Sequence, residues 1–201
     1  MKQNRPFARA AVTRKAQKLI EEGHPWVYDT EITGIEGGCE NGGLVDVVSD
    51  KGAYLGTGFI SERSKIRVRI LSRNANDRFD EAFWERRLRW AWDYRKTVMG
   101  EDASCCRVIF GEADQFPGLT VEVLVTQTLS AGIERIKPLL FPLLKKVLGR
   151  DGQAVRGVYE RNDAAIRELE GLPQGKGWFG GDGGPTRTEI TENGIVYGVD
   201  F

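Results

Sequence analysis

The stretch from residue 65 to residue 71 alternates strictly in polarity, and this alternation constrains the fold more than any other feature of the sequence. One face of an extended chain would carry the apolar side chains Ile66, Val68 and Ile70. The opposite face would carry only cations, which are Lys65, Arg67 and Arg69. The pattern predicts a half-buried β-strand whose basic face meets either an anionic partner or water.

Charge is distributed unevenly along the chain. The 29 basic residues balance 29 acidic ones, so net charge alone does not point to a nucleic-acid partner. However, residues 1–20 hold six basic residues and no acidic one, and residues 63–73 hold five basic residues and no acidic one. The acidic residues concentrate in the C-terminal two-thirds. This asymmetry favours an anionic partner for the N-terminal part of the chain.

Periodicity and punctuation predict the elements of the first hundred residues. Apolar spacing favours a helix over residues 13–22. Extended runs predict two further strands, over residues 44–48 and 53–60. Asp80 is placed to cap a helix that runs to about Val98.

The second half of the chain predicts short strands around one long helix. Strands are expected over residues 107–110 and 157–160 and at two places within 119–129. An amphipathic helix is expected over residues 134–148. Its prolines, Pro138 and Pro142, are expected to delay the start to Lys137 or Phe141 because proline lacks an N–H group.

The C-terminal segment is rich in glycine. A short helix is expected over residues 163–170, and the glycine-rich residues 174–186 are expected to form a mobile loop. Asn193-Gly194 lies between two extended runs, which predicts a hairpin over residues 188–201 with a type I′ turn.

The helix that Asp80 begins carries three tryptophans, Trp84, Trp90 and Trp92. One helix stripe does not need so much apolar surface, so we expect this helix to lie between two domains and to contact both. Stacking on nucleic-acid bases is the alternative role for these rings. Trp26 is expected in the core.

Composition excludes several classes of protein. No apolar run approaches the roughly 20 residues that span a bilayer, and the N-terminus lacks the apolar core of a signal peptide. The odd number of cysteines, without a C-x-x-C pair, favours structural thiols in a reducing cytoplasm. His24 is the only histidine and is expected to be a structural hydrogen-bonding residue, so no metal site is expected.

Four stretches of sequence, in this order, resemble one family. They are Gly23 to Tyr28, Gly56 to Ile60 with Ile66 to Leu71, Gly111 to Thr120, and Tyr159 to Asp163 with Arg167 to Gly171. The chain resembles the large-subunit rRNA methyltransferase I family, S-adenosylmethionine-dependent enzymes that methylate cytosine C5 in 23S rRNA. The resemblance covers nearly the whole chain from Arg14 onward. One departure is a hairpin near Val121 to Leu124 that is shorter than the family's.

The resemblance implies a PUA domain that binds RNA, a central domain and a Rossmann-like methyltransferase domain. The fold class expected here is α+β, with an N-terminal PUA-like mixed β-barrel, a small β-β-α-β-β domain, and the Rossmann-like methyltransferase domain absent. The expected divisions are residues 1–73 for the PUA-like domain, 74–100 for a linker and the aromatic interdomain helix, and 101–201 for the central domain. The hairpin at its end would lead to the missing catalytic domain.

The acid-free basic segments and the resemblance together predict which residues bind RNA. Seven cations of the two acid-free segments are predicted to do so: Arg14, Lys15, Lys18, Arg63, Lys65, Arg67 and Arg69. No residue is expected to be catalytic or to bind a metal or cofactor, because neither an Asp-Pro-Pro string nor a suitable glycine-rich loop occurs. S-adenosylmethionine is expected only for the full-length parent, which would methylate cytosine after attack of a cysteine thiolate on C6.

Two functional hypotheses remain at this point. The first is the RNA-recognition portion of a 23S rRNA (cytosine-C5) methyltransferase, and the alternative is a stand-alone PUA-type RNA-binding or adaptor protein without enzymatic activity. Glu112 and Asp114 form a carboxylate pair, for which turn hydrogen bonding or contact with the absent domain is favoured over acid–base catalysis. Three questions stay open: which nucleotide is the target, whether the parent is a homodimer, and whether the end at Phe201 is natural.

Overall fold

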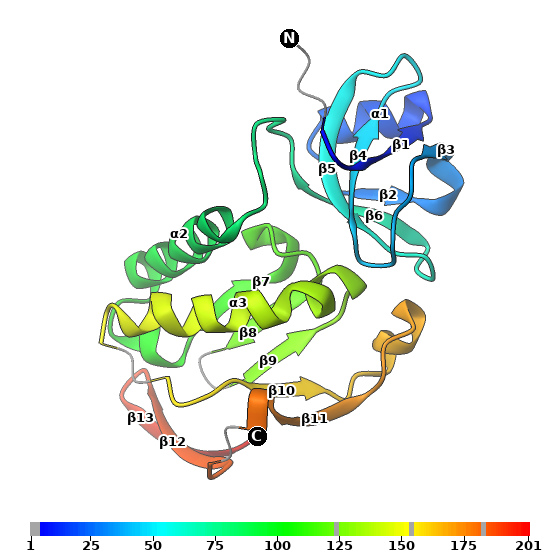
Figure 1. Ribbon diagram of the computed structural model, residues 1–201. Coiled ribbons are helices and arrows are strands. Elements are labelled where there is room, and N and C mark those ends of the chain that lie inside the picture. The colour runs from blue at the N-terminus through cyan, green and yellow to red at the C-terminus, as the bar shows by residue number, and fades with distance from the viewer. Residues whose placement is uncertain (1–4, 123–124, 153–154, 182–183) are drawn as a thin grey trace.

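The computed structural model describes residues 5–122, 125–152, 155–181 and 184–201. It has two lobes joined by residues 73–80 (Figure 1). The N-terminal lobe is a six-stranded sheet with one helix, α1. The second lobe is a five-stranded sheet with two long helices, α2 and α3, and a separate two-stranded hairpin.

The N-terminal sheet is mixed, with the strand order β2-β6-β5-β4-β1-β3. Its strands β1 and β4 are parallel, and the other neighbours are antiparallel. The strands predicted over 44–48, 53–60 and 65–71 are confirmed as β4, β5 and β6 within one residue at each end. The bounds are β1 Ala8–Val12, β2 Trp26–Tyr28, β3 Ile32–Glu36, β4 Leu44–Val48, β5 Tyr54–Ile60 and β6 Ile66–Ser72.

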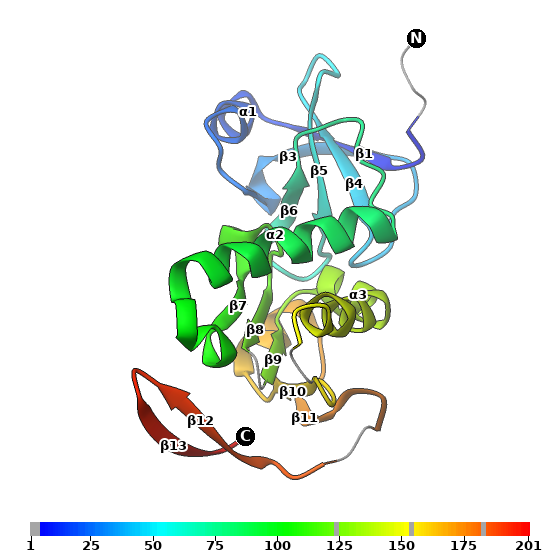
Figure 2. The same cartoon turned by 90° about the vertical axis from the view of Figure 1, so that its left-hand side faces the viewer.

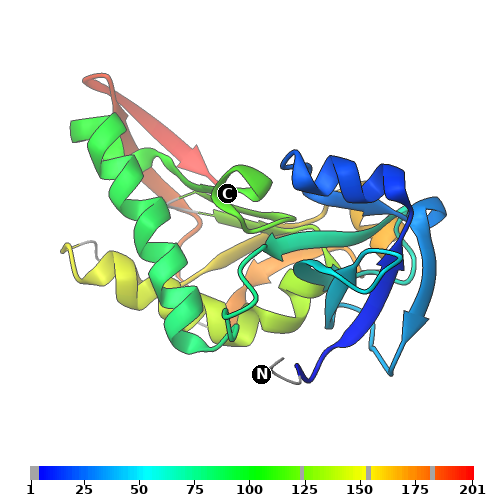
Figure 3. The ribbon, with the colours of Figure 1, turned by 90° about the horizontal axis from the view of Figure 1, so that it is seen from above.

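Helix α1, Arg14–Glu21, confirms the helix predicted over 13–22. It begins where the Thr13 side chain accepts a hydrogen bond from the Ala16 N–H at 3.3 Å. Ala16 and Ile20 are buried against the core of the sheet, which leaves the other side of the helix in solvent. Figure 3 shows α1, in blue, along one edge of the N-terminal lobe, with the C-terminal hairpin, in red, at the other end of the molecule.

The second lobe has the strand order β11-β10-β9-β8-β7. Three antiparallel strands precede the long helix α3 and two follow it, and the crossover through α3 makes β10 parallel to β9. The predicted β-β-α-β-β pattern is therefore wrong by one strand. The bounds are β7 Arg107–Phe110, β8 Leu119–Glu122, β9 Val125–Thr128, α3 Ala131–Gly149, β10 Tyr159–Asn162 and β11 Gly175–Trp178. The predicted shortened hairpin includes Val123 and Leu124, which lie outside the described residues.

Helix α3 starts at Ala131, six residues before the earlier of the two predicted starts, Lys137 and Phe141, so that prediction is wrong. Ser130 caps the helix by accepting the Ile133 N–H at 3.3 Å. The prolines each remove one backbone hydrogen bond inside the helix. Burial of nine α3 residues, most of them apolar, offsets this loss.

Two predictions for the C-terminal segment have different outcomes. The mobile loop expected over 174–186 is wrong for its first part, because β11 pairs antiparallel with β10 and the Trp178 ring meets the Tyr159 ring edge-on at 5.3 Å. Asp182 and Gly183 lie outside the described residues. The predicted hairpin is confirmed as β12, Arg187–Glu192, with β13, Ile195–Asp200. Asn193 and Gly194 have φ angles of 50° and 75°, as a type I′ turn requires.

The predicted short helix over 163–170 is a 3₁₀ helix, η4, Ala165–Glu170. Another short 3₁₀ helix, η3, Gly111–Asp114, joins β7 to β8. Both elements lie at the boundary between the lobes, where Glu170 and Glu112 contact the N-terminal lobe.

Helix α2, Glu81–Met99, lies between the lobes, as predicted (Figure 2). Asp80 caps it by accepting the Phe83 N–H at 2.9 Å. Trp84 is 1% exposed and packs on Phe59 of the N-terminal lobe and Phe116 of the second, at ring distances of 6.1 and 5.9 Å. Trp84 therefore confirms the predicted interdomain packing.

The other two tryptophans of α2 differ from Trp84. Trp92 is buried in the second lobe, and its indole N–H donates to Asp151 at 2.8 Å. Trp90 is 58% exposed, so the prediction that it packs between the domains is wrong. Its position on the helix turns it toward solvent, since the apolar stripe through Leu88 and Ala91 already faces the core.

Candidate nucleic-acid interface

Helix α1 presents three of the predicted RNA-binding cations to solvent. Arg14, Lys15 and Lys18 are all exposed. The Arg14 Nε lies 3.4 Å from Asp50 and the Lys18 Nζ lies 3.7 Å from Glu22. Exposed ion pairs such as these contribute only about 0–1 kcal/mol, so the cations can exchange their partners for phosphates at little cost.

The cations in β6 and directly before it do not form the uniform basic face that the alternation predicted. Lys65 is exposed, and Arg67 is half-buried and donates to the Ser61 carbonyl at 2.8 Å. Arg69 is buried and forms an ion pair with Glu170 at 2.7 Å. The basic side of β6 is thus covered at one end by η4, which the chain reaches a hundred residues later.

Arg63 is exposed, and its side chain lies directly against Gly171 at the end of η4. The structure therefore does not bring the seven predicted residues together. Arg14, Lys15 and Lys18 lie on α1, whereas Arg63 lies at η4, which is the orange segment near the second lobe in Figure 1.

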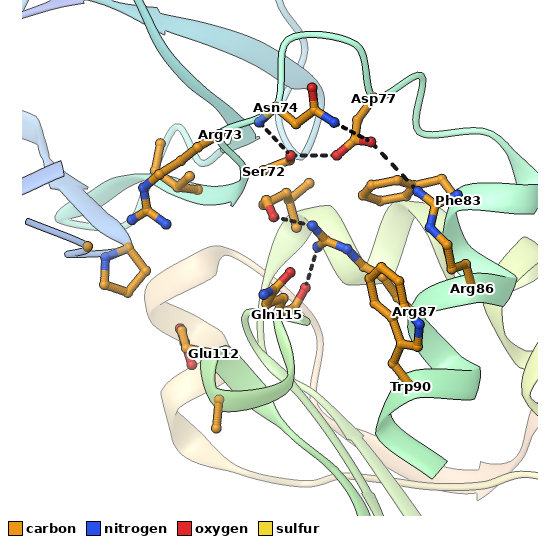
Figure 4. A pocket seen from close by; sticks show the side chains of 15 residues that line it. Ser72, Arg73, Asn74, Asp77, Phe83, Arg86, Arg87, Trp90, Glu112 and Gln115 are labelled. Carbon is orange, nitrogen blue, oxygen red and sulfur yellow. Dashed lines mark hydrogen bonds and ion pairs between the residues drawn. The ribbon is translucent and has the colours of Figure 1, made fainter. Parts of the chain in front are cut away.

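A cleft of about 680 Å³ lies between the lobes and beside α2 (Figure 4). It is lined by the α1–β2 turn, the end of β6, residues 73–77, α2 and η3. Ligand sites usually occupy roughly 300–1,000 Å³, so the cleft is large enough for a ligand. Figure 4 shows Arg73 and Arg86 on opposite sides of it.

Arg87 anchors the inner wall of the cleft. Its guanidinium donates to the carbonyls of Leu71 at 2.5 Å and Gln115 at 3.0 Å, and it lies 4.3 Å from the centre of the Phe83 ring. Burial lowers the pKa of Arg87 to about 10, so the side chain stays protonated at neutral pH. It therefore ties the end of β6 to η3 and α2, and is already committed to these contacts.

Arg73 and Arg86 are held more loosely. Arg73 donates through Nε to Ile20 O and through Nη2 to His24 O, each at 3.2 Å. Arg86 lies 3.6 Å from Asp77, which also accepts hydrogen bonds from the Ser72 hydroxyl at 2.6 Å and the Asn74 side-chain amide at 3.5 Å. Both guanidinium groups thus keep N–H groups that face the cleft and are not required by these contacts.

The carboxylates beside the cleft have structural partners. Glu112 accepts from the Trp26 indole N–H at 2.9 Å, which joins the two lobes. Asp114 accepts from Arg95 at 2.5 Å and from the Phe110 N–H at 2.6 Å. Turn hydrogen bonding is thus confirmed for Asp114. Trp26 was predicted to lie in the core, but it is half-buried at the boundary between the lobes, so that prediction is wrong.

Sequence reasoning missed Arg86 and Arg87 as parts of a site. The available signal was the pair of arginines among the aromatic residues of α2. Only the aromatic rings were interpreted, as interdomain packing or, alternatively, as stacking surfaces for bases. The cysteines offer no activated thiol in the region around α2, since burial raises the pKa of both Cys105 and Cys106.

No helix in the described ranges is long and apolar enough to cross a membrane.

The class of the N-terminal lobe follows from its sequence as well as its sheet. Residues 11–73 match the model of a family described as a PUA-like domain. The chain is also similar to curated relatives along almost all of its length. It is 32% identical over 97% of the chain to "Ribosomal RNA large subunit methyltransferase I" of Klebsiella pneumoniae, and 33% identical over 92% to the same-named protein of Aliivibrio fischeri.

Two solved structures share the fold of this chain. A putative S-adenosylmethionine-dependent methyltransferase from Streptococcus mutans matches 96% of this chain, with a TM-score of 0.75 and 19% identity. A putative methyltransferase complexed with SAH matches 96% of the chain with the same TM-score. The chain spans about half the length of these proteins: 49% and 46% of the two curated relatives and 48% and 47% of the two structures.

These matches correct the expected fold class. The expected fold class held that the Rossmann-like methyltransferase domain is absent, whereas 96% of the chain matches the fold of putative methyltransferase chains. Its second lobe is a five-stranded mixed sheet, and not the smaller β-β-α-β-β unit. The prediction failed because it relied on local strings, such as Asp-Pro-Pro and a glycine-rich loop, while similarity of fold lies in the arrangement of the sheets.

Proposed function

We propose that this chain is the RNA-recognition portion of an S-adenosylmethionine-dependent 23S rRNA (cytosine-C5) methyltransferase and works in the cytoplasm. The names of the relatives, the PUA-like match and the similarity to methyltransferase folds support the proposal. The observation that carries it is the row of exposed cations on α1 of a PUA-like domain. The proposal keeps the division into residues 1–73, 74–100 and 101–201.

Six of the seven predicted cations belong to the proposed interface. They are Arg14, Lys15, Lys18, Arg63, Lys65 and Arg67. Each phosphate that such a cation neutralises releases condensed counterions, so affinity rises with the number of contacts and falls with salt. Arg69 is left out, because its guanidinium is buried against Glu170 and RNA would have to displace that ion pair.

S-adenosylmethionine would supply the methyl group, and none of the residues described here is assigned to it. The cleft beside α2 does not fit this cofactor. Its sulfonium cation would lie among the guanidinium groups of Arg73, Arg86 and Arg87. The lining carboxylates that could offset this repulsion already accept hydrogen bonds from the chain. In this proposal the residues of this chain hold and orient the RNA.

Replacing Arg14, Lys15 and Lys18 together with glutamine is expected to weaken RNA binding. Loss of up to three phosphate contacts should lower the slope of log K against log salt by about 2–3. The measurement is fluorescence anisotropy with a labelled fragment of 23S rRNA at several salt concentrations. The three side chains are exposed, so the thermal unfolding midpoint should stay unchanged.

The matched control replaces three exposed cations of the second lobe, Arg156, Lys176 and Arg187, with glutamine. This variant has the same change in net charge and should keep the wild-type salt slope. Equal losses in the two triple variants would show that total charge, and not α1, determines binding. If the wild type and both variants all failed to bind the RNA fragment, the proposed function would be refuted.

A further inference from the structure

Helix α2 exposes two large aromatic rings on one side. Trp90 and Tyr94 are each 58% exposed, and they are four residues apart, so they are neighbours on the helix surface. A guanidinium lies over each ring, that of Arg86 at 5.5 Å from the Trp90 centroid and that of Arg95 at 5.0 Å from the Tyr94 centroid. Neighbouring exposed apolar rings of this kind mark a candidate binding surface.

This pair of rings, the α2 aromatic row, begins at the cleft between the lobes. Trp90 lines the cleft, and Figure 4 places its indole at the rim below Arg86. Arg73 lies across the cleft, on the side that the N-terminal lobe forms. In the part of the chain that the structure describes, no hydrogen bond involves the Trp90 indole N–H, although the ring N–H groups of Trp26, Trp84 and Trp92 are all bonded.

The charges around the cleft favour an anion. Its acidic lining residues are Glu112 and Asp77, and both already have partners. Glu112 accepts a hydrogen bond from Trp26, and Asp77 accepts one from Ser72 and forms an ion pair with Arg86. Arg73 and Arg86 retain N–H groups that can meet phosphate oxygens. A ligand that combines flat apolar rings with phosphates satisfies both the exposed indole and the cations.

We propose that the cleft and the α2 aromatic row bind unpaired nucleotides of RNA, with a base stacked on Trp90 and its flanking phosphates facing Arg73 and Arg86. This deepens the proposed function and rests on it, since it names the kind of RNA that the chain holds. Every base has a π-face, so aromatic rings with interleaved arginines hold single strands with little sequence preference. Bases inside a duplex are stacked on each other and cannot reach the indole.

The site continues from the N-terminal lobe. Arg73 is bonded to the carbonyls of Ile20 and His24 at the end of α1, and α1 carries the cations of the proposed interface. An RNA could therefore lie with its backbone on α1 while an unpaired segment enters the cleft. The two contacts differ in chemistry, because the first is electrostatic and the second includes stacking, and so they can be tested separately.

The test is Trp90→Ala, with binding measured by fluorescence anisotropy on a labelled single-stranded RNA and on a fully paired duplex of the same length. Stacking contributes about 1–3 kcal/mol per base, so single-strand affinity should fall by roughly tenfold, with little change in the salt slope. Duplex affinity should stay within about twofold of the wild type. Trp90→Phe, which keeps an aromatic face, should restore most of the single-strand affinity.

Leu169→Ala serves as the control, because Leu169 is also exposed and lies on η4, outside the cleft. It should leave both affinities unchanged. Equal weakening on single strand and duplex, or no effect of Trp90→Ala on either, would overturn the stacking site. If the α1 variant still loses affinity while Trp90→Ala does not, the proposed function stands and only this inference fails.

A protein partner that docks on the aromatic row would give a different result. Trp90→Ala would then leave single-strand affinity unchanged, which refutes the RNA site. Quenching of intrinsic tryptophan fluorescence gives an independent readout. Single-stranded RNA should quench the wild type and should quench Trp90→Phe much less, since Trp84 and Trp92 are buried and the half-buried Trp26 and Trp178 do not line the cleft. Equal quenching of the two proteins would contradict the proposal.

Discussion

Trp84→Ala is expected to destabilise the chain by about 3–5 kcal/mol, the range for truncation of a buried aromatic residue. The indole is 1% exposed and lies against Phe59, Phe79, Phe83 and Phe116. Its N–H also donates to the Phe79 carbonyl at 3.1 Å, which would lose its partner. Because the ring touches both lobes, the substitution should weaken the contact between them as well as the core.

Urea unfolding followed by circular dichroism measures this effect, as a lower midpoint at a similar slope. Trp90→Ala is the matched control on the same helix. It removes the same atoms from an exposed position and should change stability by no more than about 0.5 kcal/mol. Similar midpoints for the two variants would contradict the assignment of Trp84 to the interdomain core.

Glu170→Ala is expected to cost about 3–5 kcal/mol, because it leaves the Arg69 guanidinium buried without its counter-ion. The side chain of Glu170 is 3% exposed, and its second oxygen accepts the Ala131 N–H at the start of α3 at 3.4 Å. Loss of the carboxylate thus affects the contact between β6, η4 and α3 at once. The measurement is again the urea midpoint.

The double variant Arg69→Met with Glu170→Leu removes both charges and fills the same space with apolar atoms. It should recover most of the lost stability, as replacements of buried ion pairs do in other proteins. An exposed pair offers a comparison, since Arg107→Gln, which breaks the 2.6 Å contact with Glu122, should cost no more than about 1 kcal/mol. A cost for Glu170→Ala as small as this would show that the Arg69–Glu170 pair is solvated.

The same double variant tests the function of Arg69. If this guanidinium serves the interior, as its burial indicates, RNA affinity and salt slope should stay at wild-type values. A loss equal to that of the α1 variant would return Arg69 to the interface that the alternation of residues 65–71 predicted.

Local structure could be predicted well wherever neighbours in sequence supply the interaction. Asp80 caps the helix it was expected to cap, and Asn193-Gly194 makes its turn. Prediction failed at the start of α3, because the two prolines led to an expected start at Lys137 or Phe141, whereas Ser130 caps the helix. Burial of α3 against the sheet offsets the penalty of the prolines, and burial depends on residues far away in sequence.

The candidate site could be predicted only in part. The α1 cations are exposed because the amphipathic helix must turn its polar side outward, which the local pattern already states. Trp84 and Trp90 could not be told apart in the same way, since both stand in one aromatic run. Only the packing of α2 between two sheets decides that one ring is enclosed and the other lines a cleft.

The alternation over residues 65–71 by itself determined that a strand forms there and which side chains share each face, because the period of a β-strand is a local property of the backbone. It could not determine what covers the basic face. Glu170 lies far from Arg69 in the sequence, beyond most of the second sheet and the crossover helix, and the two meet only in the tertiary structure. For this reason a residue predicted to contact RNA is found in a buried ion pair. The cleft beside α2 arose in the same way, from residues that meet only when the two lobes pack.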